Sequence, residues 1–166
     1  VLSPRLDHVL RELAAGRPVL ALQNLAFAWY PKWHYAVAVG YDLDRGEIIL
    51  RSGVTERHAL ALATFERTWR RGDSWAMVTL APGEMPATAE ELPYLESVVA
   101  YERLGDHEQA ARAYRAAATR WPASLSAWLG LGNSLYADGD KSGAEKAFRE
   151  GVTRHPEAAV AYNNLA

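Results

Sequence analysis

The chain has 166 residues, of which 49% are hydrophobic and 23% are charged, and its formal net charge is −2. This length is enough for one ordinary domain or two small ones, and the composition is that of a globular protein. The charge gives no general electrostatic reason to bind nucleic acid or an anionic membrane. There is no cysteine, so these residues contain no disulfide, no Cys-ligated zinc site and no thiol nucleophile.

Short apolar runs and turn residues alternate through the first half of the chain. A helix is predicted over 3–15, with Ser3 as its cap, Pro4 in its first turn and Gly16 at its end. A second, short helix is predicted over 64–71, capped by Thr64. Strands are predicted over 18–23, 35–41, 47–51, 57–63 and 74–81. This mixture predicts an α+β fold with a largely antiparallel sheet.

The character of the sequence changes after "PGEMP" at 82–86, because residues 87–166 are Ala-rich and helical. They also repeat with a fixed offset of about 34 residues, the period of a helix-turn-helix solenoid unit. The coincident positions are Gly105 and Gly139, Asp106 and Asp140, Ala110 and Ala144, Tyr114 and Phe148, Pro122 and Pro156, and Tyr94, Trp128 and Tyr162. The sequence therefore predicts an all-α solenoid in this half.

The second unit resembles the tetratricopeptide repeat (TPR). The signature positions of that family hold Trp128, Leu131, Gly132, Ala144, Phe148 and Pro156. The resemblance divides the region into repeats over about 91–124 and 125–158 and a partial repeat over 159–166. The first repeat departs from the motif, with Ser97 and Val98 where Leu and Gly are preferred. A repeat cut within its first helix leaves an apolar face unburied, so we expect the natural chain to continue.

The TPR resemblance implies a protein or peptide partner, held along the surface formed by the first helix of each repeat. The corresponding positions are Leu92, Leu95, Val99, Arg103, Leu129, Asn133, Tyr136 and Ala137. Some relatives clamp a peptide carboxylate there with lysines and asparagines, and only Asn133 and Arg103 are similar to that pattern. An apolar or extended segment is the better expectation. The alternative is that these side chains pack against the N-terminal domain or a neighbouring repeat.

The stretches "AGRPVLALQ" and "WHYAVAVGYD" resemble the second half of a double-glycine (C39-like) peptidase domain, which has a papain-like fold. The resemblance covers roughly residues 5–80, within an N-terminal domain predicted over 1–83. It implies that His34 is the general base, and that the nucleophilic Cys belongs to a first half absent from these residues. Arg51 and Ser52 stand where the orienting Asp of that family usually closes the next strand. The family also suggests a bacterial envelope or periplasmic location.

Other interpretations of single residues stay open. A lone histidine among aromatic residues, such as His34, is ordinarily structural. The other histidines lack metal-ligand spacing, and we expect neither a metal nor a cofactor. "RTWRR" at 67–71 is either a phosphate-binding patch or a solvated face. Asp42 and Asp44 lie in a turn and are poor substitutes for the orienting Asp.

Three hypotheses follow. The first is a protein–protein interaction module of TPR repeats attached to an inactive or incomplete cysteine-peptidase domain. The second is a working cysteine peptidase whose Cys lies upstream of these residues and whose repeats recruit the substrate. The third is a scaffold without either activity. None of them involves nucleic acid or a membrane span, and the oligomeric state is undetermined by the sequence.

Overall fold

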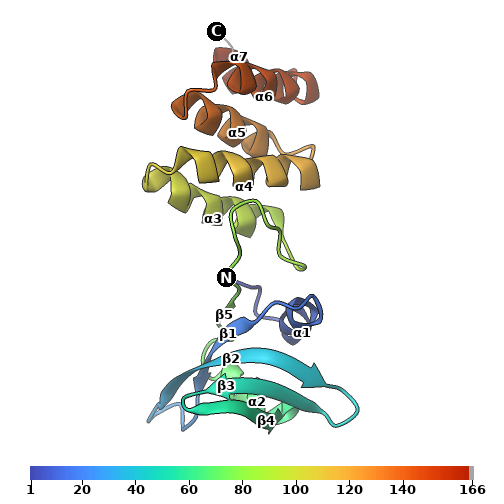
Figure 1. Cartoon of the computed structure of the whole chain (residues 1–166), viewed down its shortest axis with the longest axis vertical. Coiled ribbons are helices and arrows are strands. Elements are labelled where there is room, and N and C mark those ends of the chain that lie inside the picture. The colour runs from blue at the N-terminus through green and yellow to red at the C-terminus, as the bar shows by residue number, and fades with distance from the viewer. Residues whose placement is uncertain (165–166) are drawn as a thin grey trace. The chain divides into compact units, whose positions relative to one another are not determined.

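The computed structural model describes residues 1–164 and shows an α+β region followed by consecutive helices (Figure 1). The chain forms two compact units. The first consists of Val1–Thr79 together with Pro86–Thr88, and the second of Leu80–Met85 together with the residues from Ala89 onward. Within residues 1–164, no helix has both the length and the apolar character needed to cross a membrane.

A five-stranded antiparallel sheet forms the centre of the first unit. Its strands lie in the order β4-β3-β2-β1-β5. Their bounds are β1 Val19–Asn24, β2 Trp33–Asp42, β3 Glu47–Ser52, β4 Thr55–Ala61 and β5 Ala76–Met77. The strands β1 to β4 are neighbours in both sequence and space and form antiparallel pairs. Short turns join β2 to β3 and β3 to β4, while the loop over 25–32 joins β1 to β2.

One face of the sheet is buried, as the alternation of side chains along the strands requires. Val19 and Ala21 on β1 lie opposite Ala38 and Ala36 on β2, and all four are at most 1% exposed. Two helices, α1 (Leu6–Ala14) and α2 (Leu62–Arg70), contribute to the same apolar cluster. Their buried members are Val9 and Leu13 on α1, and Phe65 and Trp69 on α2. The small side chains on the strands leave room for these larger ones.

The helix starts predicted from capping residues are wrong. Helix α1 begins at Leu6 after the N-cap Arg5, and α2 begins at Leu62 after the N-cap Ala61; neither cap makes a side-chain hydrogen bond. Arg5 instead bonds the carboxylate of Asp7 at 3.0 and 3.2 Å. The predicted end of α1 is confirmed, since Gly16 follows it with a left-handed φ of +74°.

The closing strand predicted over 74–81 is much shorter in the structure. Only Ala76–Met77 pair, as β5, with β1. Asp73 and Ser74 have φ values of +56° and +53°, so the chain turns sharply just before the strand. The indole of Trp69 donates a hydrogen bond of 2.9 Å to the carbonyl of Trp75 and holds this turn against α2.

The second unit contains five helices within the described residues. They are α3 (Glu91–Arg103), α4 (His107–Arg120), α5 (Leu125–Ala137), α6 (Lys141–Arg154) and α7 (Ala159–Asn163) (Figure 1). The partial repeat predicted over 159–166 contains α7, and its residues 165–166 lie outside the described part of the chain.

The predicted 34-residue offset is confirmed at the starts of the second helices. Asp106 caps α4 by accepting from the amide of Gln109, and Asp140 caps α6 by accepting from the amide of Gly143. A glycine with positive φ precedes each cap and allows the tight turn from the preceding helix. The same local chemistry therefore builds both helical hairpins.

Small residues let the helices of the second unit pack closely. The alanines at the contacts of α4, α5 and α6 are at most 2% exposed, namely Ala110, Ala117, Ala127 and Ala144. The ring of Tyr114 on α4 lies against Gly130 of α5, and the ring of Phe148 on α6 lies against Gly132 of the same helix. Helix α5 is thus held between two aromatic rings, each seated on a glycine.

Candidate functional site

The ring of His34 is hydrogen-bonded to a serine. His34 is the second residue of β2 and is partly buried, and its Nε2 lies 2.7 Å from Oγ of Ser52 at the end of β3. Either group can be the donor, depending on the imidazole tautomer. The resemblance to the peptidase family placed Ser52 at the orienting position, but it did not predict this bond.

Strand geometry explains why His34 lies here. It is two residues before Ala36 on the buried face of β2, and it is directly opposite Gln23 on β1. Gln23 is 2% exposed and donates a hydrogen bond of 2.6 Å to the hydroxyl of Thr68 on α2. The imidazole therefore stands at the polar end of a face that is otherwise apolar.

Asn24, which follows Gln23, fixes the loop that leads to His34. Its Oδ1 accepts hydrogen bonds from the amides of Ala26 and Lys32, each at 3.0 Å. Its Nδ2 donates to the carbonyl of Phe27 at 3.3 Å. A side chain that is only 1% exposed thus adds to the backbone hydrogen bond of 2.9 Å from the amide of Leu25 to the carbonyl of Lys32. Sequence reasoning assigned no role to Asn24, and its position at the end of an apolar run before a loop was the available signal.

Exposed aromatic rings surround the His34 end of the sheet. Phe27 and Trp29 stack with centroids 5.8 Å apart, although they are 63% and 82% exposed. Tyr35 is 58% exposed and makes an edge contact with Trp75. We call the exposed residues Phe27, Trp29, Tyr30, Trp33 and Tyr35 the aromatic rim.

The chemistry available at His34 differs from that of a histidine paired with a carboxylate. A serine hydroxyl can fix the orientation of the imidazole, but it carries no charge to stabilise an imidazolium. Asp42 is at the other end of β2, roughly 26 Å along the strand, and binds Arg45. Within residues 1–164, no group of three or more His, Cys, Asp or Glu side chains could hold a metal ion.

In the second unit, the positions assigned to the partner-binding surface divide into two groups. Leu95 is 8% exposed and belongs to the apolar core of the repeats. Val99 and Leu129 are half-buried, and Leu129 packs against that core. The others project into solvent on α3 and α5: Leu92, Arg103, Asn133, Tyr136 and Ala137. We call Leu92, Val99, Leu129, Asn133 and Tyr136 the first-helix surface.

The start of the third repeat adjoins this surface. Nδ2 of Asn164, directly after α7, donates a hydrogen bond of 3.5 Å to Oδ1 of Asn133 on α5. The first helices of successive repeats are therefore neighbours on the Asn133 side.

Comparison with known families supports this description of the second unit. Residues 95–166 match the family model of the tetratricopeptide repeat. No curated protein matches the chain. Tetratricopeptide repeats stack into solenoids whose first helices form protein-binding surfaces, so the match supports a protein–protein interaction module.

Proposed function

We propose that this chain binds a protein partner as an extended, largely apolar segment on its first-helix surface, and that its first unit is an incomplete, inactive peptidase-like domain. The observation that carries the proposal is the division of side chains on α3 and α5. Leu95, Leu131 and Leu135 fill the core, while Leu92 and Tyr136 remain 67% and 61% exposed. The repeat packing does not use those two side chains.

The chemistry of the surface selects the kind of partner. Leucine, valine and tyrosine offer apolar contacts, and Asn133 offers an amide that can donate to and accept from a peptide backbone. Arg103 is the exposed cation among the positions assigned to this surface. One cation without clustered lysines gives little preference for a terminal carboxylate, so an internal segment with apolar side chains fits better.

The test is selection of peptides from a displayed random library, with the whole chain as bait. We expect apolar segments with micromolar dissociation constants, weakened roughly tenfold by Tyr136→Ala and by Asn133→Ala. Arg115→Ala, an exposed position on the second helix of the first repeat, is the matched control and leaves the affinity unchanged. Equal effects of all three substitutions, or no selected peptide, would reject the first-helix surface as the binding site.

The proposal for the first unit is supported by the His34–Ser52 pair. The strand opened by His34 resembles the general-base strand of the double-glycine peptidases, and Ser52 bonds the ring from the place of the orienting carboxylate. A neutral hydroxyl activates an imidazole as a general base less than a carboxylate does. The 166 residues contain no cysteine, so a cysteine mechanism would need a nucleophile from outside them.

The alternative, a working peptidase with its cysteine elsewhere in the protein, makes a different prediction. The protein containing that segment would cleave a peptide carrying a Gly-Gly site, and His34→Ala would abolish the cleavage. We expect no cleavage by the 166-residue chain. Cleavage that survives His34→Ala would exclude His34 as the base.

A further inference from the structure

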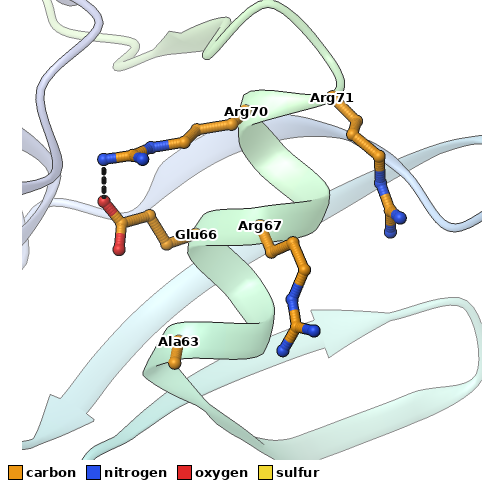
Figure 2. A pocket seen from close by; sticks show the side chains of 5 residues that line it. All are labelled: Ala63, Glu66, Arg67, Arg70 and Arg71. Carbon is orange, nitrogen blue, oxygen red and sulfur yellow. Dashed lines mark hydrogen bonds and ion pairs between the residues drawn. The ribbon is translucent and has the colours of Figure 1, made fainter. Parts of the chain in front are cut away.

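Three arginines at the end of α2 point in two directions: Arg67 and Arg70 in its last turn, and Arg71 as its C-cap residue. Figure 2 shows Arg70 turned toward Glu66, with which it forms an ion pair of 2.7 Å, while Arg67 and Arg71 project from the other side of the helix. A hollow of about 430 Å³ is lined by Ala63, Glu66, Arg67, Arg70 and Arg71. The acidic residue of the hollow is thus already engaged by one arginine.

Arg67 and Arg71 have no carboxylate to balance them. Among the ion pairs of the part of the chain that the structure describes, Arg70 takes part in one and neither Arg67 nor Arg71 does. They are four residues apart, and because the C-cap Arg71 keeps a helical backbone conformation, the two side chains are neighbours and their like charges repel. Repulsion of this kind favours an anion between the two groups.

Arg71 adds a second, independent observation. Its Nε is buried and has no hydrogen-bond acceptor within residues 1–164. A buried donor without an acceptor is destabilising, and the loss is larger for a charged group. An oxyanion in the hollow could accept from the terminal nitrogens of the same guanidinium group.

We propose that Arg67 and Arg71 form a binding site for a phosphate group. Two planar guanidinium groups provide two positive charges and several N–H donors. This set suits a phosphate dianion better than it suits a carboxylate, which carries one negative charge. Ala63 adds no bulky side chain to the lining of the hollow, and the carboxylate of Glu66 is paired with Arg70. The site is local, because the chain as a whole has a net charge of −2 and would not concentrate anions at its surface.

The experiment is a titration of the whole chain with inorganic phosphate at constant ionic strength, followed by ³¹P line broadening and by the melting temperature. We expect saturable binding, weakened roughly tenfold by Arg67→Gln and by Arg71→Gln. Arg11→Gln, an exposed position on α1 that does not line the hollow, is the control and leaves phosphate affinity within about twofold. Circular dichroism of each variant shows that the fold is retained.

A second experiment distinguishes between a lipid headgroup and a free phosphate ester as the source of the phosphate group. Sedimentation with phosphatidylcholine vesicles that contain phosphatidylglycerol tests a lipid headgroup, and glycerol 3-phosphate tests a free phosphate ester. Binding of either, lost in Arg67→Gln and Arg71→Gln and kept in Arg11→Gln, supports the site. No saturable binding to any of the three probes, or equal loss in all three variants, would overturn it.

Discussion

The ring of Phe148 on α6 packs directly over Gly132 on α5. A β-carbon added at Gly132 would overlap atoms of that ring, and a β-carbon at Gly130 would overlap the ring of Tyr114 on α4. The glycines therefore set how closely α5 approaches both neighbouring helices. In the first repeat, Val98 holds the place that corresponds to Gly132 and is 1% exposed.

We expect Gly132→Ala to destabilise the repeats by about 2 kcal/mol. Alanine gains up to about 1 kcal/mol of helix propensity over glycine, but overpacking against a buried ring costs more than that gain. Gly151→Ala on α6 is the control, because a β-carbon there meets its nearest atom, Cβ of Trp128, at an ordinary 3.5 Å. That substitution should stabilise by roughly 0.5 kcal/mol. Urea unfolding followed at the helical circular dichroism band distinguishes the two; a stabilising Gly132→Ala would contradict the packing argument.

The stability of the repeats should fall in alkali because of Tyr114. Burial raises the pKa of its phenol, and the charge and hydrogen bond of Glu102 raise it further. An unfolded tyrosine ionises near pH 10, so above about that pH the unfolded state releases a proton that the folded state keeps. The contribution of Tyr114 to the free energy of unfolding is fully present below about pH 10. It is lost as the pH rises above that value, by up to about 1.4 kcal/mol per pH unit.

The measurement is the urea midpoint of the wild type and of Tyr114→Phe between about pH 7 and about pH 11. We expect the phenylalanine variant to lose less stability over this range. Tyr136→Phe, at an exposed position, should follow the wild type. Parallel curves for the wild type and Tyr114→Phe would show that the buried phenol is not the source of the alkaline loss.

The bond between His34 and Ser52 should be measurable as a coupling energy. A double-mutant cycle with His34→Ala, Ser52→Ala and the pair should give about 1 kcal/mol near neutral pH, the net value of one partly buried hydrogen bond. Replacing Arg51 instead of Ser52 provides the control, because Arg51 is exposed. A coupling near zero for His34 and Ser52 would mean that the serine does not hold the imidazole in solution.

Glu12 should be one of the most sensitive positions of the first unit. Its side chain is fully buried, and Oε1 accepts from the amide and from the hydroxyl of Thr88, both at 2.7 Å, while Arg17 lies 3.4 Å from Oε2. We expect Glu12→Ala to cost about 3 kcal/mol, because it leaves these donors without an acceptor.

Hydrogen exchange of the amides in α1 and at Thr88 provides the readout for Glu12→Ala. Glu66→Ala removes a carboxylate whose partner Arg70 is exposed, and it should change stability by less than about 1 kcal/mol. If the two substitutions were equally mild, the Glu12 contacts would be incidental to folding.

Much of the fold was predictable because its causes are local in sequence. The α+β character followed from alternating strands and turn residues, and the repeat from residues that recur at one offset. Asp106 and Asp140 are an example, since each caps the helix that follows it by accepting from the backbone amide three residues further along. The helix starts failed because Ser3 and Thr64 were assigned as caps from residue type alone. The predicted start of the strand at 74 was wrong because Asp73 and Ser74 have positive φ values although neither of them is a glycine.

The candidate sites were less predictable because they depend on contacts distant in sequence. The bond of His34 to Ser52 requires the register of two strands, and the burial of Leu95 requires the second helix of its own repeat. The direction of Arg67 relative to Arg70 could not be read from "RTWRR", since both are simply cations on a short helix. The side chain of Glu66 decides which arginine remains unbalanced.

The Glu12–Thr88 bonds have a practical consequence for dividing the protein. Residues 86–88 belong to the first unit, although residues 80–85, which precede them, belong to the second. The two units are therefore interleaved along the chain, and no single cut between 79 and 89 separates them cleanly. A fragment ending at residue 79 would retain the whole sheet and still lose both donors that Thr88 gives to a buried carboxylate.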